Sequence, residues 1–188
     1  MSILTKKHTP NTGSSDIDWN PSKGWHEARI IAVASVGQKI NPHSGKMVDR
    51  ISVVILTDET VDFSGDQVGK VMVETFNDSL HEKSAISTKL LNPVGIKVDS
   101  YDQLLGQTLR IKTGPSDCEQ YCNIINVDEA EKELALPENT YLPKYLIEKN
   151  GVPTGFEILT EDGVMEGIRP VGDNSAVSTN PDKEDMYA

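Results

Sequence analysis

Two cysteines are the first residues of this chain whose type and spacing suggest chemistry. Cys118 and Cys122 are the only cysteines, and thiolates at such short spacing are potential zinc ligands. A structural zinc site usually needs four ligands, and the sequence contains neither a second cysteine pair nor a suitably spaced histidine pair. In an extended segment the two thiols lie too far apart for a disulfide. We therefore expect free thiols, no metal and no cofactor.

Residues typical of catalysis are equally sparse. The chain contains no phosphate-binding loop, no G-x-S-x-G nucleophile motif and no H-E-x-x-H metalloprotease motif. Asp58, Glu59 and Asp62 form a small acidic cluster, which is more typical of a solvated loop than of a cation site. A nuclease would need several carboxylates that converge on one metal. We therefore expect a protein that is not an enzyme.

One cationic loop is the main sign of a binding function. Residues 37–48 contain Lys39, His43 and Lys46 but no Asp or Glu, and Arg50 follows closely. In an acidic chain, a loop of this composition is a candidate for contacts with phosphate groups. Lysines on loops are also ordinary surface residues, so the composition alone leaves both interpretations open.

The other candidate contacts lie on predicted strands and at a strand-to-helix corner. Phe76 and Tyr121 stand at strand ends, where they either stack on bases or pack in the core. His81 and Lys83 either bind phosphate or support the corner. Alternation along a strand places Arg110 and Lys112 on the same side. The candidate nucleic-acid contacts are Lys39, Lys46, Arg50, Phe76, His81, Lys83, Arg110, Lys112 and Tyr121.

These residues are positioned by a series of short predicted strands interrupted by one helix. Ser84 is a plausible N-cap for a helix over 85–91, and Asn92, Pro93 and Gly95 end it. The predicted strands are 25–36, 49–56, 70–76, 107–113 and 121–127. Five strands with a helix between the third and fourth form the layout of an OB-fold, a small barrel that binds oligonucleotides. We therefore expect a mainly β fold with a five-stranded OB-fold-like barrel, in which strands two and three form the binding face.

The chain divides into four predicted regions. Polar residues 1–22 read as a flexible arm, and 23–130 hold the OB-fold-like domain. Residues 131–171 are expected to form an irregular extension, of which 141–159 keep enough apolar side chains to pack on the barrel or on a partner. Residues 172–188 are too polar to form a core and are predicted to be a disordered acidic tail.

Net charge is unevenly distributed among these regions. The whole chain has a formal net charge of −11. Residues 20–150 hold 14 Lys and Arg against 19 Asp and Glu, and residues 151–188 hold two against eight. Binding to nucleic acid would therefore require a local basic face, while the tail would recruit partner proteins. The predicted partner contacts in the tail are Asp182, Glu184, Asp185, Met186 and Tyr187.

The sequence also indicates a compartment. No stretch is long and apolar enough for a membrane span, and the first residues have lysines but no apolar core of a secretory signal. Two cysteines without an evident bridge suit a reducing environment. We expect a cytoplasmic protein with no membrane association, and an oligomer is compatible with the sequence.

The corner segment also carries a family resemblance. Residues 79–84 read "SLHEKS", followed by Leu104, Leu105 and Gly106 and then by Asn123 and Ile124. With the opening "GWHEARIIAVASVGQ", this pattern resembles phage- and prophage-encoded proteins with an S-L-H-E-K-S motif. The resemblance covers roughly residues 24–128. It implies an OB-fold single-stranded-DNA-binding or replication-accessory protein.

Two functions follow as hypotheses. The first is a phage-type single-stranded-DNA-binding protein that supports replication or recombination and recruits partners through its acidic tail. The alternative is an OB-fold adaptor that binds protein and not nucleic acid, with residues 141–159 as its contact surface. The acidic domain and its few aromatic residues favour the adaptor, whereas the cationic loop and the resemblance favour the DNA-binding protein.

Overall fold

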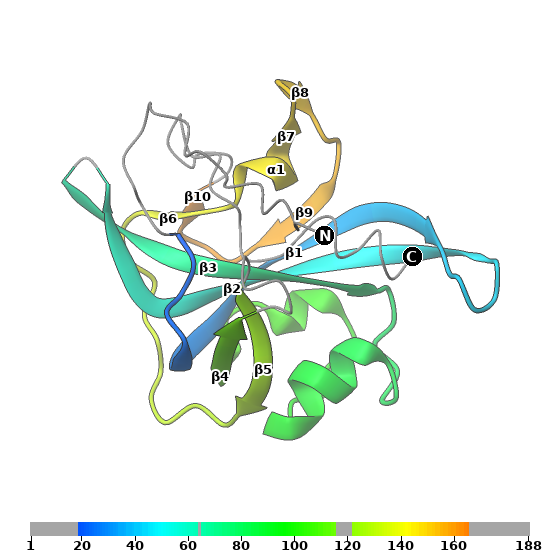
Figure 1. Cartoon of the computed structure of the whole chain (residues 1–188), viewed down its shortest axis with the longest axis horizontal. Coiled ribbons are helices and arrows are strands. Elements are labelled where there is room, and N and C mark those ends of the chain that lie inside the picture. Colours follow the sequence, from blue (N-terminus) through cyan, green and yellow to red (C-terminus); the bar gives the residue numbers. More distant parts are fainter. Residues whose placement is uncertain (1–18, 64, 116–121, 166–188) are drawn as a thin grey trace, which may run out of the picture.

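Strands dominate the protein, as its computed structural model shows for residues 19–63, 65–115 and 122–165. The prediction of a mainly β fold is therefore confirmed (Figure 1). A helical segment separates the third strand from the fourth, also as predicted. The five main strands are β1 (Gly24–Ile40), β2 (Met47–Phe63), β3 (Asp66–Asn77), β4 (Thr108–Pro115) and β5 (Cys122–Asp128).

The five strands form one antiparallel sheet in the order β3-β2-β1-β4-β5. Among the described residues no strand pairing joins β3 to β5, so the sheet is not a closed barrel. The expected closure is therefore not found. The first six residues of β1 pair with β4, and its later residues Ala32–Ser35 pair with a strand from the C-terminal extension.

Two predicted loops are instead the ends of long hairpins. Residues 37–48 were expected to be a loop, but β1 runs on to Ile40 and β2 begins at Met47. The turn between them is closed by Asn41, whose N–H donates to the carbonyl of Lys46 at 2.8 Å. Similarly, residues 57–69, which lie between the predicted strands 49–56 and 70–76, are mostly paired strand. Glycines caused the error, because Gly37 lies beside a β-bulge and not in a turn.

The helical segment lies where the sequence predicted it. It comprises a short helical start at residues 85–86, a π-helical turn η1 (Ser87–Leu91) and a 3₁₀ turn η2 (Asn92–Val94). The Ser84 hydroxyl accepts a hydrogen bond from the Ser87 N–H at 3.4 Å, which is the expected capping contact. Gly95 ends the segment with φ of 67°, in the left-handed region.

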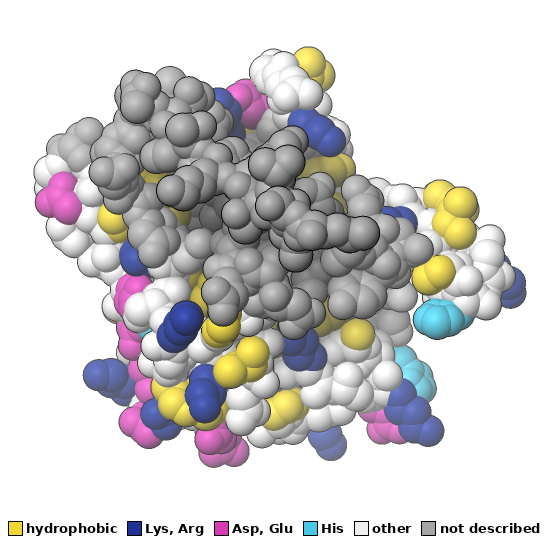
Figure 2. Space-filling view, viewed as in Figure 1, with side chains coloured by type: hydrophobic (Ala, Val, Ile, Leu, Met, Phe, Trp, Pro, Cys, Tyr) yellow, Lys and Arg dark blue, Asp and Glu magenta, His cyan; other side chains and the backbone are white. Residues whose placement is uncertain are grey.

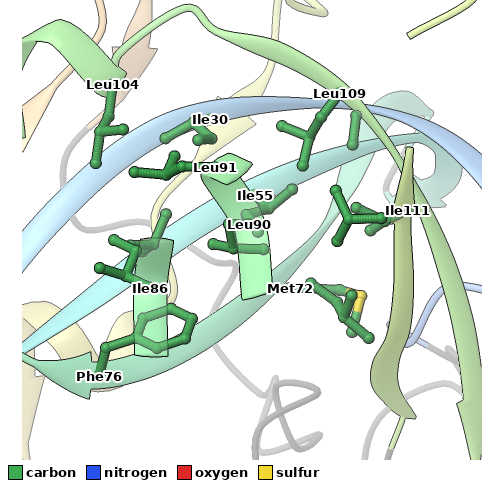
Figure 3. Close-up of a cluster of buried hydrophobic side chains, with 14 of the residues drawn as sticks. Ile30, Ile55, Met72, Phe76, Ile86, Leu90, Leu91, Leu104, Leu109 and Ile111 are labelled. Atoms are coloured by element: carbon green, nitrogen blue, oxygen red, sulfur yellow. The ribbon is translucent and has the colours of Figure 1, made fainter. Parts of the chain in front are cut away.

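The inner face of the sheet packs on this helical segment. Ile51, Val53 and Ile55 alternate along β2 and point into one cluster with Ile86 and Leu90 (Figure 3). A second 3₁₀ turn, η3 (Tyr101–Leu104), adds Leu104 to the same cluster. This cluster, called the inner core below, is the core that an amphipathic helix and five strands are expected to form.

The C-terminal extension packs on the opposite, outer face. Val54 and Leu56 of β2 and Val71 and Val73 of β3 form a second cluster with residues of the extension, including the fully buried Leu142. Figure 1 shows the extension and the helical segment on opposite sides of β1–β3. The part of the extension that the structure describes, to residue 165, therefore contains short regular elements after an irregular start. Its elements are β6 (Thr140–Tyr141), α1 (Lys144–Ile147), β7 (Glu148–Lys149), β8 (Val152–Pro153), β9 (Glu157–Thr160) and β10 (Val164–Met165).

A partly buried ion pair fixes the extension to the sheet. Arg29 on β1 donates from Nε to both carboxylate oxygens of Glu161, at 3.0 and 3.1 Å, and from Nη2 to the same group. Its Nη1 donates to the carbonyl of Leu134 at 2.8 Å. The hydrogen bond to Glu161 raises the pKa of Arg29 against the opposing effect of burial. One side chain of β1 thus holds both ends of the extension.

The beginning of β1 is held by residues that the sequence assigned to the flexible arm. Trp19 is buried with its ring centroid 6.1 Å from that of Phe63. Ser22 donates to the Glu59 carboxylate through its N–H, at 3.0 Å, and through its hydroxyl. Burial, which by itself raises the pKa of Glu59, is outweighed by these bonds and by nearby Lys70, so its pKa lies below the usual value. The packed structure therefore begins before residue 23.

No helix in the described part of the chain is long and apolar enough to cross a membrane.

Candidate nucleic-acid interface

The predicted cationic loop forms the tip of a two-stranded ribbon, residues 37–50, that extends beyond the body of the protein (Figure 1). His43 and Lys46 are exposed in its turn. In Figure 2, hydrophobic, histidine and lysine or arginine side chains gather at the right-hand end, over this tip, with no acidic side chain among them. The ribbon therefore presents the sequence-predicted cations to solvent at one end of the molecule.

The ribbon cations do not all point the same way. Arg50 has the parity of Val54 on β2, so it lies on the outer face, and Lys39 is in register with Val48 on that same side. Both Lys39 and Arg50 are partly buried. Met47 has the parity of Ile51, which places it on the inner side, toward the helical segment.

Residues 79–84 form a tight corner between β3 and the helical segment. The N–H of Lys83 donates to Nδ1 of His81 at 3.2 Å, and the N–H of Ser84 donates to the carbonyl of His81 at 2.8 Å. His81 therefore supports the corner through its backbone and one ring nitrogen. The side chains of His81 and Lys83 are both exposed, so the supporting role and a phosphate contact are compatible.

The corner and the ribbon lie at the same end of the protein. Arg50, at the base of the ribbon, pairs with Asn77 at the end of β3, and the N–H of Asp78 donates to the carbonyl of Asp49 at 2.7 Å. The corner begins one residue later, and Figure 1 shows the chain leaving β3 beside the ribbon. Six exposed side chains here are called the ribbon–corner surface: Ile40, His43, Lys46, Met47, His81 and Lys83.

Three carboxylates border this surface, and two of them are engaged. Asp49 accepts a hydrogen bond from Gln38 at 2.8 Å. Asp78 accepts one from the Tyr101 hydroxyl at 2.5 Å, and burial together with this bond raises the pKa of Tyr101. Glu82 stands in the corner between His81 and Lys83 and is exposed. The surface is therefore cationic at the ribbon tip and mixed in charge at the corner.

Arg110 and Lys112 form a separate patch at the opposite end of β1. They share the outward side of β4, as predicted, and Lys112 pairs with Trp25. Arg110 lies 4.9 Å from the centroid of the Trp25 ring and binds Glu131 at 2.5 Å. Since β1 has 17 residues, up to roughly 50 Å of strand separates this patch from the ribbon tip. The two predicted cation groups therefore lie at opposite ends of β1.

The one aromatic candidate among the described residues does not line the surface. Phe76 is only 5% exposed and belongs to the inner core (Figure 3), so its ring is not available to stack on a base. Tyr121 lies outside the described residues, as do the predicted partner contacts of the acidic tail, Asp182, Glu184, Asp185, Met186 and Tyr187.

The predicted binding face of strands two and three is also occupied. Its outer side chains, such as Val54 and Val73, pack against Leu142 and Leu146 of the extension, both almost fully buried. Other cations are held in ion pairs, since Lys70 binds Glu59 at 3.4 Å and Lys89 binds Glu74 at 3.0 Å. The middle of this face is therefore not available to a ligand in this conformation.

Sequence reasoning missed Ile40 and Met47, which were read as part of a loop. Their signal was two large apolar residues that flank a short polar segment rich in turn-forming residues, a pattern typical of a hairpin tip. Within the described residues, no group of His, Cys, Asp and Glu side chains is arranged to hold a metal ion. Comparisons with protein-family models, with curated proteins and with solved structures found no match to this chain.

Proposed function

We propose that this protein binds single-stranded DNA on an OB-fold-like sheet and supports replication or recombination, in the manner of the phage-type proteins that its sequence resembles. The order of its five strands, with the helical segment between β3 and β4, supports the fold assignment. An OB-fold is a partly open five-stranded barrel, and the strand order is compatible with it, although no β3–β5 pairing is found among the described residues.

The observation that carries the proposal is the set of exposed cations at one end of an acidic chain. Lys46 and Lys83 are exposed, and neither forms an ion pair with a described residue. Lysines that neutralise phosphates release counterions, and this contribution supplies most of the affinity of non-specific binding. Their gathering at the ribbon–corner surface supports binding there despite the net charge of −11.

Because the extension covers the outer face, we expect the bound DNA to lie elsewhere than predicted from the sequence. Strands two and three were predicted to hold the ligand, but the extension buries their apolar outer side chains. We therefore propose that single-stranded DNA binds at the ribbon–corner surface, which is exposed. The proposal also keeps a cytoplasmic location and recruitment of partner proteins by the acidic tail.

A titration of a labelled dT oligonucleotide tests the proposal. The full chain and a variant that ends at residue 171 are compared at two salt concentrations, on single and double strands. We expect the Lys46→Ala/Lys83→Ala variant to bind about tenfold more weakly. The slope of log affinity against log salt should also fall by about 1.4, the value for two phosphate contacts on a single strand.

A matched control carries the same loss of charge elsewhere. Lys132→Ala/Lys149→Ala removes two exposed lysines outside the ribbon–corner surface, so its affinity should stay within about twofold of wild type, because distant charges are screened. An equal loss in both double variants would mean that only net charge matters. If neither form of the protein binds dT at low salt, the proposed function is wrong.

A second function is favoured by one observation. Tyr145, Val152 and Leu159 of the extension are large apolar residues that remain exposed. These exposed side chains could contact a partner protein, as the adaptor hypothesis requires. The buried Leu142 and Leu146 of the same segment instead pack on the sheet. Capture of a defined replication protein by a chain that fails to bind dT would select this alternative.

A further inference from the structure

Two large apolar side chains stand exposed at the tip of the ribbon. Ile40 is 57% exposed and Met47 is 55% exposed. They are partners in the strand register, so their side chains lie directly opposite each other on one side of the hairpin. Single exposed apolar residues are common on protein surfaces, but a facing pair on a protruding ribbon is a continuous apolar contact area.

Basic residues flank this pair in the sequence, although alternation along the strand places Lys39 on the outer side, opposite the pair. Lys39 and Lys46 are its immediate neighbours in the sequence, and His43 lies in the turn between the strands. No Asp or Glu occurs from residue 37 to residue 48. An apolar area on a protein partner would not require positive charge around it. A polyanion that also has apolar groups is complementary to both the charge and the apolar pair.

The pair also faces the corner. Met47 has the parity of Ile51, whose side chain packs with Ile86 and Leu90 of the helical segment. The exposed His81 and Lys83 stand just before that segment in the chain. The apolar pair and the corner cations therefore lie on the same side of β2, opposite the extension.

We propose that the Ile40–Met47 pair packs on the unstacked bases of a single strand, while Lys46, His43 and Lys83 contact its phosphates. This inference rests on the proposed function and names how the same surface selects single strands. Apolar side chains of DNA-binding proteins insert between bases, and every base has an apolar face, so such a contact is independent of sequence. The flexible thioether of Met47 suits bases of different size. In a duplex the base faces are covered by stacking, so the pair would favour single strands.

The test separates contacts to bases from contacts to phosphates. Wild type and the Ile40→Ser/Met47→Ser variant are titrated with a labelled dT oligonucleotide and with an abasic strand of the same length, which has the phosphates but no bases. We expect the variant to lose about tenfold in affinity for dT and to bind the abasic strand within about twofold of wild type. Wild type should therefore prefer dT to the abasic strand, and the variant should lose this preference.

Val152→Ser is the matched control, because Val152 is an exposed apolar residue on the extension. It should leave both affinities unchanged, and the melting temperatures of all variants should match wild type, since the replaced side chains are exposed. If wild type binds both strands equally and the double variant does the same, the inference is overturned while the proposed function stands. If wild type binds neither strand, the proposed function itself fails.

One further outcome would also overturn the inference. If the double variant keeps its affinity for dT but loses a self-association that sedimentation detects in wild type, the pair is a contact between two copies of the chain.

Discussion

The two faces of the β1–β2 hairpin differ in what covers them. On the outer face, the extension covers the sheet and is fixed by the Arg29–Glu161 pair. On the inner face, the helical segment covers the middle of the strands but stops before the ribbon, where Ile40 and Met47 stand exposed. The same two strands therefore have one face closed by the chain itself and one face open at its end.

This difference shows that a fold assignment does not locate a ligand surface. The face of β2 and β3 that an OB-fold layout suggests for binding is the one that the extension buries. The exposed cations lie where the covering elements stop. The surface available to a ligand is therefore decided by what packs on the sheet as much as by the sheet.

The largest expected effect comes from loosening the closed face. Glu161→Gln leaves the Arg29 guanidinium with its charge only partly compensated, and we expect a loss of about 3 kcal/mol in the free energy of unfolding. Urea denaturation followed by circular dichroism measures it. Affinity for dT, measured well below the melting temperature, should not change, because the ribbon–corner surface lies away from the extension.

Glu157→Gln is the control for this variant, since Glu157 is an exposed carboxylate on β9, and it should alter stability by less than about 0.5 kcal/mol. A gain of tenfold or more in affinity for dT on Glu161→Gln would break the comparison. It would mean that the outer face is the binding face and that the extension blocks it.

Acid should loosen the beginning of β1 before it affects the ribbon. The pKa of Glu59 is lower in the folded protein than its ordinary 4.5, so its contribution to stability is present above that value and is lost as pH falls through the folded pKa. At pH 7 the melting temperature of wild type should be higher than that of Glu59→Gln. The difference between the two melting temperatures should shrink below about pH 4.5. Melting curves from pH 7 to pH 3 measure it, and a constant difference across this range would contradict the assignment.

The smallest expected effect concerns the mixed charge of the corner. Glu82 stands between His81 and Lys83 and would repel a phosphate bound there. We expect Glu82→Gln to strengthen binding of dT by about twofold at low salt, a gain that salt should remove. Glu138→Gln, an exposed carboxylate beside β6, should have no effect. Weaker binding of Glu82→Gln would show that the corner does not contact the strand.

The series of strands and the capped helix were predictable because their signals are local. β-branched runs predict strands, and Ser84 with Asn92, Pro93 and Gly95 bounds the helix. Strand length was not predictable, since Gly37 in a bulge has the same composition signal as a glycine in a turn. The packing of the extension on the outer face was not predictable for a different reason. Residues 51–57 of β2 are buried on both sides, and a strand buried on both faces shows no alternation that would indicate which element covers it.

The candidate site was predicted in part. The exposure of Lys46 and Lys83 agrees with the sequence interpretation, because loops and corners lie at the surface. The sequence left open whether Phe76 is buried, and it did not indicate the pairing of Arg110 with Glu131, since burial and ion pairing depend on residues distant in the chain. Ile40 and Met47 were overlooked because residues 37–48 were read as a loop, whereas both lie on paired strands where their side chains face each other.

The order of synthesis gives the extension a further significance. β9 and Glu161 leave the ribosome long after β1, β2 and β3, with which the extension packs. At 5 to 20 residues per second, residues 131–165 take roughly 2 to 7 s to be made. During that interval Val54, Leu56, Val71 and Val73 have no partner in the nascent chain to bury them. A chain that stops near residue 130 would leave this apolar sheet face exposed, so a segment that is translated later protects the first strands from aggregation.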